Sequence, residues 1–249
     1  MEGGLLTISA FMFSTDKKEL VFASFGLYPE QITFETISAL RKCDKVYLTC
    51  VRREKAGLLL SLFPKAELIS AIPFEVLVLK VMGAFLKHDR VGVLDYGDPS
   101  FLCAFSERLR LECLKNKVGF KKYQAVSSLN AIISDLGLGD LGPAGLYLAT
   151  VHYWDAASKF INPAVPLLLF SPDRARLAGA PDGLLARVVK DIQRVYPPGH
   201  DIYFINCQSA SSGKKRARRV KVARLGRSLS GLKFDTTMYI PAIAPKKRA

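Results

Sequence analysis

The chain has 249 residues, of which 49% are hydrophobic, with a formal net charge of +14 and a pI of about 9.6. This apolar content is enough for a sizeable buried core, which excludes a mainly disordered chain. No apolar run reaches the ~18 residues that a membrane-spanning helix needs, so we expect a soluble, cytoplasmic protein without a membrane partner. Five dispersed cysteines without a CxxC pair and three separated histidines lack metal-ligand spacing, and we predict no metal site.

Apolar strands alternate with helices in the first half of the chain. A buried strand is predicted over residues 19–25 (ELVFASF), and a helix should begin near Thr33. Further strands are expected at 45–51, 91–96 and near 120–126, with helices over 58–63, 72–86 and 104–115. Strands that are apolar throughout and alternate with helices indicate a parallel sheet covered on both faces.

The second half has more strands and fewer helices. Residues 127–139 (SSLNAIISDLGLG) are predicted to form a helix with Ser127 or Ser128 as its N-cap. A second helix is expected over 183–196, and short strands are expected at 146–150, 165–171, 201–207, 219–225 and 236–242. We therefore predict an α/β fold of two domains, 1–124 and 125–249, with a mainly parallel N-terminal sheet and a mixed C-terminal sheet.

Positive charge is concentrated toward the end of the chain. Residues 174–249 contain 17 of the 36 lysines and arginines but only four acidic residues, and the densest run is KKRARRVKVAR, from Lys214 to Arg224. Its later part alternates basic with apolar residues, which is typical of a strand with one solvated basic face. Nucleic acid stays open as a partner, but it is not favoured because no aromatic residue interleaves with these charges to stack on bases.

The stretch VGVLDYGDPSFLCAF, residues 91–105, is the first candidate for a functional loop. Its apolar run stops at Asp95 and is followed by Tyr-Gly-Asp-Pro. Ligands of parallel α/β sheets lie outside the carboxyl ends of the strands, where this loop is predicted. Gly97 would allow the backbone to approach a ligand, and Asp98 can accept hydrogen bonds from hydroxyls or an amine. An ordinary Asx-type turn explains the same residues, so both interpretations stay open.

Several stretches, in the right order, resemble the tetrapyrrole methylase superfamily, the class III S-adenosylmethionine (SAM) methyltransferases. PEQITFETISALRKCDKVYL is similar to the opening unit of that family, VGVLDYGDPSFL to its Gly-Asp-Pro loop, and AVSSLNAIISDLGL to its interdomain segment and helix. The resemblance spans residues 20–242 or nearly so. It implies two α/β domains, SAM as the cofactor in the interdomain cleft, and a homodimer.

One branch of that superfamily is similar over further stretches. GLYLATVHYWDAASKFINPAVPLLLFSPD, RVYPPGHDIYFINC and TTMYIPA resemble parts of the borosin-type peptide backbone N-methyltransferases. That branch implies a ribosomal peptide amide as the acceptor, supplied as a separate chain. The Gly-Asp-Pro loop, which replaces the Tyr-Gly-His-Pro of the branch, favours a tetrapyrrole or another small molecule instead. The Arg/Tyr set of the branch is missing from AIPFEVLVLKVMGAFLK, so a binding or regulatory protein without catalysis is a further alternative.

The resemblance also assigns site residues. Tyr96 and Asp98 would be the catalytic candidates, and both would face SAM together with Gly97. Tyr47 and Tyr153 are further candidates for a general base, although a tyrosine with an ordinary pKa of ~10 is a poor base at neutral pH. The other implied cofactor contacts are Phe101, Ser127, Ser128, Phe170, Gln208 and Ser209. Core packing of the two phenylalanines and helix capping by Ser127 or Ser128 are the competing interpretations.

Overall fold

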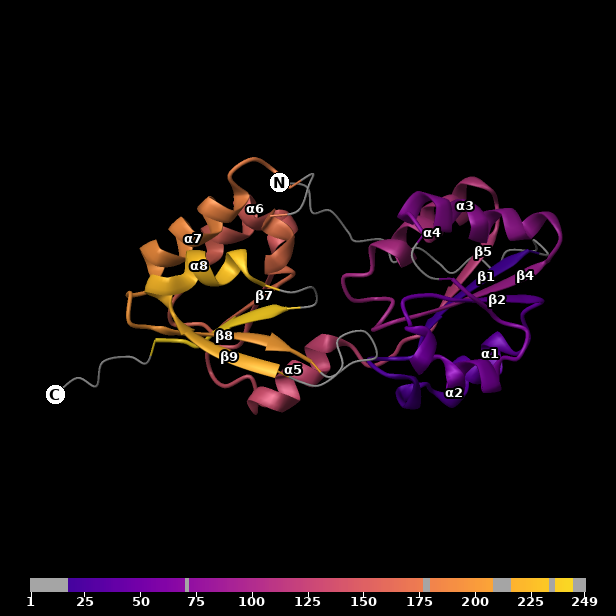
Figure 1. The fold of residues 1–249 in the computed structure, drawn as a ribbon, viewed down its shortest axis with the longest axis horizontal. Coiled ribbons are helices and arrows are strands. Elements are labelled where there is room, and N and C mark those ends of the chain that lie inside the picture. The colour runs from indigo at the N-terminus through magenta and orange to yellow at the C-terminus, as the bar shows by residue number, and fades with distance from the viewer. Residues whose placement is uncertain (1–17, 70–71, 177–179, 208–215, 233–235, 244–249) are drawn as a thin grey trace, which may run out of the picture. The chain divides into compact units, whose positions relative to one another are not determined.

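The computed structural model describes residues 18–69, 72–176, 180–207, 216–232 and 236–243. The chain divides into two compact units, Met1–Ala125 (unit 1) and Val126–Ala249 (unit 2), each built on its own sheet (Figure 1). Among the described residues, no helix combines the length and the apolar character that a membrane crossing requires.

Unit 1 is a parallel sheet with the strand order β3-β2-β4-β1-β5. The strands are β1 (Glu19–Ser24), β2 (Lys45–Leu48), β3 (Glu67–Leu68), β4 (Arg90–Asp95) and β5 (Gly119–Lys122). The helices are α1 (Phe34–Leu40), α2 (Gly57–Leu62), α3 (Phe74–Gly83) and α4 (Ala104–Lys115), with the short 3-10 helices η1 (Pro29–Gln31), η2 (Arg53–Lys55) and η3 (Ala84–Leu86). Helices α1 and α2 lie on one face and α3 and α4 on the other (Figure 1), which confirms the predicted parallel sheet.

The central strands β1 and β4 are buried on both faces, which explains why their sequences are apolar throughout. Phe22 and Val93 pack in the cluster that contains residues of α3 and α4. On the opposite face, a Cβ atom added to Gly92 would lie 2.7 Å from Cδ2 of Leu40. Glycine in the middle of β4 therefore permits the close approach of α1 to the sheet.

Unit 2 is a mixed sheet with the order β6-β7-β10-β8-β9, as the second half of the sequence predicts. Its strands are β6 (Tyr147–Thr150), β7 (Leu167–Phe170), β8 (Asp201–Asn206), β9 (Arg216–Lys221) and β10 (Thr237–Ile240). Its helices are α5 (Ser128–Leu136), α6 (Trp154–Ala157), α7 (Leu184–Val195) and α8 (Leu225–Ser230), with the 3-10 helices η4 (Val151–Tyr153), η5 (Ser158–Phe160), η6 (Pro172–Arg176) and η7 (Val222–Arg224).

Helix α7 shows how the core of unit 2 follows from sequence spacing. Leu184, Val188 and Ile192 recur every four residues, so they form one helix face, and all three are buried against the sheet. The same core encloses Trp154, whose indole Nε1 donates a hydrogen bond to Oδ2 of Asp191 at 3.0 Å. Helices α6, α7 and α8 lie on this face of the sheet, whereas α5 lies on the other (Figure 1).

One predicted strand is partly wrong. The segment 219–225 was expected to be a strand throughout, but β9 ends at Lys221 and the chain continues as η7 and α8. The buried residues Val222, Leu225 and Leu229 explain the change, because their spacing of three and four places them on one helical face. The alternation of basic and apolar residues was a strand signal only up to Lys221.

Candidate functional site

Two glycine turns meet at the carboxyl edge of the unit 1 sheet. Strand β1 is followed by Phe25 and Gly26, and its neighbour β4 is followed by Tyr96 and Gly97. Gly97 N donates to the carbonyl oxygen of Gly26 at 2.8 Å, and Phe25 N donates to that of Asp95 at 3.0 Å. These bonds join the two turns where a parallel sheet usually receives its ligand.

Both glycines adopt a conformation that favours glycine, with φ of +82° at Gly26 and +80° at Gly97. Their surroundings differ. A Cβ atom at Gly26 would lie 2.7 Å from Oε1 of Gln31, whereas a Cβ atom at Gly97 would have no neighbouring atom within 4 Å. The backbone of Gly97 is itself buried, so the turn after β4 combines an enclosed main chain with open space next to it.

The Asp98 carboxylate holds this loop in place. Its Oδ1 accepts a hydrogen bond from Ser100 N at 2.7 Å, which forms the Asx-type turn, and its Oδ2 accepts one from Ala125 N at 2.8 Å. Asp98 thus ties the loop after β4 to the last residue of unit 1. Each carboxylate oxygen has a second lone pair, so these two bonds leave acceptor capacity for a ligand.

The aromatic candidates near the loop have different surroundings. Tyr96 is partly exposed, and its ring centroid lies 6.3 Å from that of the fully buried Phe25. Phe101 is also partly exposed, and its backbone N donates to the Asp98 carbonyl at 3.2 Å. The next residue, Leu102, has φ of +52° with 55% of its surface exposed. A bulky residue in the left-handed region stores strain, which is typical of ligand-binding loops.

Sequence reasoning missed Asp95 as a site residue. Its side chain is buried at the end of β4, and Oδ1 accepts a hydrogen bond from the Thr49 hydroxyl at 2.9 Å. The Cys103 thiol lies 4.0 Å from Oδ2. Burial raises the pKa of Asp95 above its usual range, against the opposing effect of its hydrogen bonds to the Tyr96 backbone and to Thr49. The signal available in the sequence was an acid that ends an apolar strand directly before a glycine turn.

We predict that Asp95→Asn alters the pH dependence of stability. Between the ordinary carboxyl pKa of 3.8 and the raised folded value, the folded protein holds a proton that the unfolded chain has released. The free energy of unfolding of the wild type should therefore fall as pH rises through that window. Asn keeps an oxygen acceptor for Thr49 and does not ionise. The free energy of unfolding of the variant should therefore rise relative to that of the wild type as the pH increases. Urea titrations from pH 4 to 8 measure this difference, and parallel curves would contradict the prediction.

The predicted residues of unit 2 lie at the ends of its strands and at the start of α5. Ser127 is the N-cap of α5, with reciprocal side-chain hydrogen bonds to Asn130, and the helix ends at the left-handed Gly137, so the capping prediction is confirmed. The carbonyl of Ser128 lies 3.8 Å from the Cys207 thiol at the end of β8. Phe170 is buried at the end of β7.

The sheet register relates these positions within unit 2. Thr237 of β10 pairs with Phe170 on one side and with Ile205 of β8 on the other, so β7 and β8 end at the same edge. The structure therefore brings Phe170 and the helix start at Ser128 to one edge of the unit 2 sheet. Gln208 and Ser209, which follow Cys207, lie outside the described residues.

The other base candidates fit a catalytic role poorly. Tyr47 lies in the core of unit 1, where burial raises its pKa. Tyr153 is 74% exposed at the end of η4. Among the described residues, no group of three His, Cys, Asp or Glu side chains could hold a metal ion.

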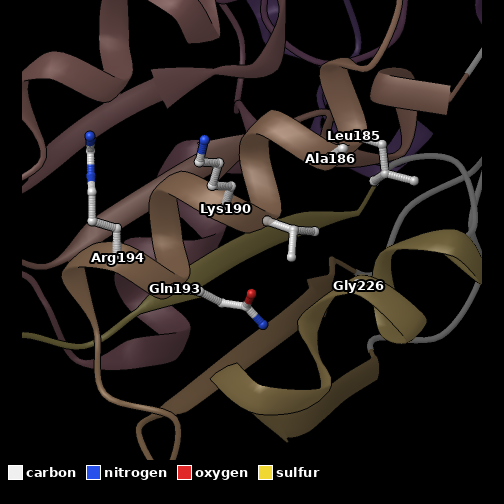
Figure 2. A pocket seen from close by; sticks show the side chains of 7 residues that line it. Leu185, Ala186, Lys190, Gln193, Arg194 and Gly226 are labelled. Carbon is white, nitrogen blue, oxygen red and sulfur yellow. The ribbon is translucent and has the colours of Figure 1, made fainter.

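Unit 2 also has a shallow groove of about 650 Å³ between α7 and α8. The apolar side chains of Leu185 and Val189 line it together with Gly226 and several polar side chains of α7. Figure 2 shows two of these polar side chains, Lys190 and Arg194, extending from the same side of the helix. None of the residues that line this groove belongs to the candidate site.

Solved structures identify the fold. No protein-family model matches the chain, and no curated protein matches it. The uroporphyrin-III C-methyltransferase of Thermus thermophilus, in a complex with S-adenosyl homocysteine, is similar with a TM-score of 0.65 and 18% identity, over 89% of this chain and 96% of that one. A second structure of that enzyme is similar with a TM-score of 0.62 and 20% identity, over 90% of this chain and 92% of that one. A structure of diphthine synthase is similar with a TM-score of 0.60 and 18% identity, over 90% of each chain.

The chain has the two-domain fold of these methyltransferases. This result confirms the predicted fold class, in which a parallel sheet is followed by a mixed sheet. The Gly97 turn lies at the carboxyl end of a central strand in that fold. The identity of 17 to 20% supports the architecture and leaves the activity to be argued from the site.

Proposed function

We propose that this chain is a SAM-dependent methyltransferase in which the loop Tyr96–Phe101 holds the cofactor. The open space beside the buried backbone of Gly97 carries the proposal, because a close-fitting ligand needs both a glycine and room next to it. The fold supports it, since a similar protein was solved with S-adenosyl homocysteine. When bound, SAM supplies a methyl group that its positive sulfur has already activated.

The residues of the loop have distinct tasks in this proposal. Asp98 fixes the loop through Ser100 and Ala125, so that the turn is rigid before the cofactor arrives. The exposed Leu102 offers apolar contact area next to it. The cofactor contacts of Tyr96, Phe101, Ser127, Ser128, Phe170, Gln208 and Ser209 stay predictions, as do the catalytic roles of Tyr96 and Asp98, the homodimer and the cytoplasmic location.

For the acceptor, we infer an attacking atom that needs little help from a base. An amide nitrogen holds its proton tightly and requires a general base. Tyr47 is buried with a raised pKa, and each oxygen of Asp98 uses one of its two acceptor positions to hold the loop. Helix α3 contains no arginine or tyrosine that could activate an amide. These features favour a tetrapyrrole or another small molecule over the peptide amide that the borosin-like stretches predict.

Labelled SAM separates the two acceptor classes. The protein would be incubated with deuteriomethyl SAM and either a reduced tetrapyrrole or hydrophobic peptides, and the products analysed by mass spectrometry. A labelled tetrapyrrole supports the inference, whereas a label on a peptide amide overturns it. Cofactor binding without transfer to any acceptor would favour the binding or regulatory alternative.

We predict that S-adenosyl homocysteine binds the wild type and that Asp98→Ala weakens this binding by about tenfold or more. The substitution removes two charge-assisted hydrogen bonds, each worth about 1.5–3 kcal/mol, and releases the loop. Isothermal titration of the full chain with SAM and with S-adenosyl homocysteine measures both affinities. The matched variant Asp98→Asn, which keeps one oxygen acceptor, should lose less. If a folded wild type binds neither compound, the proposed function fails.

A further inference from the structure

The second unit carries most of the net positive charge of the protein, and the proposed methyltransferase site does not use it. Residues 126–249 contain 18 of the 36 basic residues and eight of the 22 acidic ones, which gives +10 of the total +14. Part of this charge lies on β9, the edge strand of the unit 2 sheet. Charged side chains on an edge strand also prevent unwanted strand pairing, so charge alone does not define a site.

Strand β9 has the expected solvated basic face and also carries an arginine on its other face. Arg218 points toward the face that α6, α7 and α8 cover, since its guanidinium lies 5.3 Å from the Phe204 ring centroid and it donates to the Ser228 carbonyl at 3.3 Å. Arg219 and Lys221 lie on the opposite face, which is the face where α5 lies, and both pair with Asp201, Lys221 at 2.8 Å and Arg219 at 3.9 Å. The predicted solvated basic face is therefore confirmed for Arg219 and Lys221, and Arg218 adds a basic residue to the other face.

The sheet register places two tyrosines beside Arg219. Tyr239 of β10 pairs directly with Tyr203 of β8, and Tyr203 pairs directly with Arg219. Directly opposed residues share a face, and the two ring centroids are 6.1 Å apart. Both tyrosines are partly exposed, and the side chains of Arg219 and Lys221 are 67% and 51% exposed. Aromatic and basic side chains thus lie side by side on this face, although they are far apart in the sequence.

From this arrangement we propose that the sheet face formed by Tyr203, Tyr239, Arg219 and Lys221 binds single-stranded nucleic acid. Flat rings give bases a stacking surface, and nearby cations contact the phosphates. The charge of Asp201 neutralises that of one of the two cations, so this sheet face keeps a net positive charge. An acidic protein would need only the cations, whereas bases can also stack on the paired rings, which is why nucleic acid is the better fit.

Fluorescence anisotropy of the full chain with a fluorescein-labelled oligouridine of 12 nucleotides tests the proposal. Binding by two cations predicts a log-log salt slope of about −1.4, so affinity should fall about sevenfold between about 50 and 200 mM salt. Arg219→Gln should flatten the slope. The matched variant Arg227→Gln removes an exposed arginine of α8, on the face opposite the proposed binding surface, and should leave more of the binding intact.

Ring substitutions separate stacking from charge. Tyr203→Leu should weaken binding about fivefold or more, whereas Tyr203→Phe, which keeps the ring, should bind like the wild type. The control Tyr153→Leu removes an exposed tyrosine elsewhere in unit 2 and should have no effect. Thermal melts check that each variant is folded. An abasic oligomer with the same number of phosphates should bind more weakly than oligouridine.

Four results would overturn the proposal. These are no binding at low salt, equal binding by the Tyr203→Leu and Tyr203→Phe variants, equal binding of the abasic oligomer, and displacement of oligouridine by polyglutamate at the same charge concentration. The last result would indicate an acidic protein partner. None of these outcomes depends on the SAM titration, so the two proposals can fail separately.

Discussion

Gly97→Ala is expected to weaken the binding of S-adenosyl homocysteine at least about tenfold while the protein stays folded. Alanine at φ of +80° costs about 1–2 kcal/mol, and its methyl group enters the space that we assign to the cofactor. A tenfold loss corresponds to about 1.4 kcal/mol of binding free energy. Isothermal titration provides the affinity, and a thermal melt provides the stability.

A second glycine provides a matched control for that experiment. Gly142 has φ of +58° and no atom within 4 Å of an added Cβ, but it lies in an exposed loop of unit 2. Gly142→Ala should cost similar stability and leave the affinity unchanged. If both variants bind as well as the wild type, the space beside Gly97 is not the cofactor site. If both lose affinity equally, the loss at Gly97 arises from strain alone.

Ile192→Ala is expected to lower the free energy of unfolding of unit 2 by about 2–5 kcal/mol. Ile192 is fully buried on the inner face of α7, and removing its side chain leaves a cavity in a tightly packed core. The single tryptophan of the chain, Trp154, is buried in the same core. Its fluorescence during urea denaturation therefore follows the unfolding of this core.

Lys190→Ala is the control on the same helix. Lys190 is exposed, and substitutions at such positions usually change stability by less than about 0.5 kcal/mol. A loss below about 1 kcal/mol for Ile192→Ala would mean that the face of α7 at Ile192 packs less tightly than the structure shows.

Local sequence signals predicted the elements that depend on neighbouring residues. The predicted helix start near Thr33 and the predicted helix over 104–115 match α1 and α4, because spacing and capping are decided within a few positions. The same reasoning failed at 222–225, where a short helical spacing of buried residues followed directly on an alternating strand. Overlapping periods of this kind cannot be separated without knowing which side chains are buried.

Features that join distant parts of the chain were not predicted. The sequence marked Asp98 as a ligand contact, but its bond to Ala125, 27 positions further along the chain, depends on how the residues between them fold. The row of Tyr239, Tyr203 and Arg219 depends in the same way on the register of three strands. No aromatic residue lies within the basic run in the sequence, but in the sheet Tyr203 lies directly beside Arg219.

The five cysteines differ in a way that makes one of them a natural labelling position. None of the five forms a disulfide, and Cys50 is the exposed one among them. Burial raises the pKa of Cys43 and of Cys103 to about 11, and that of Cys113 to about 12, so these thiols stay protonated at neutral pH. Cys50 follows β2 at the carboxyl edge of the unit 1 sheet, two residues after Leu48. A maleimide dye should therefore react first at this edge and report optically on the binding of a cofactor there.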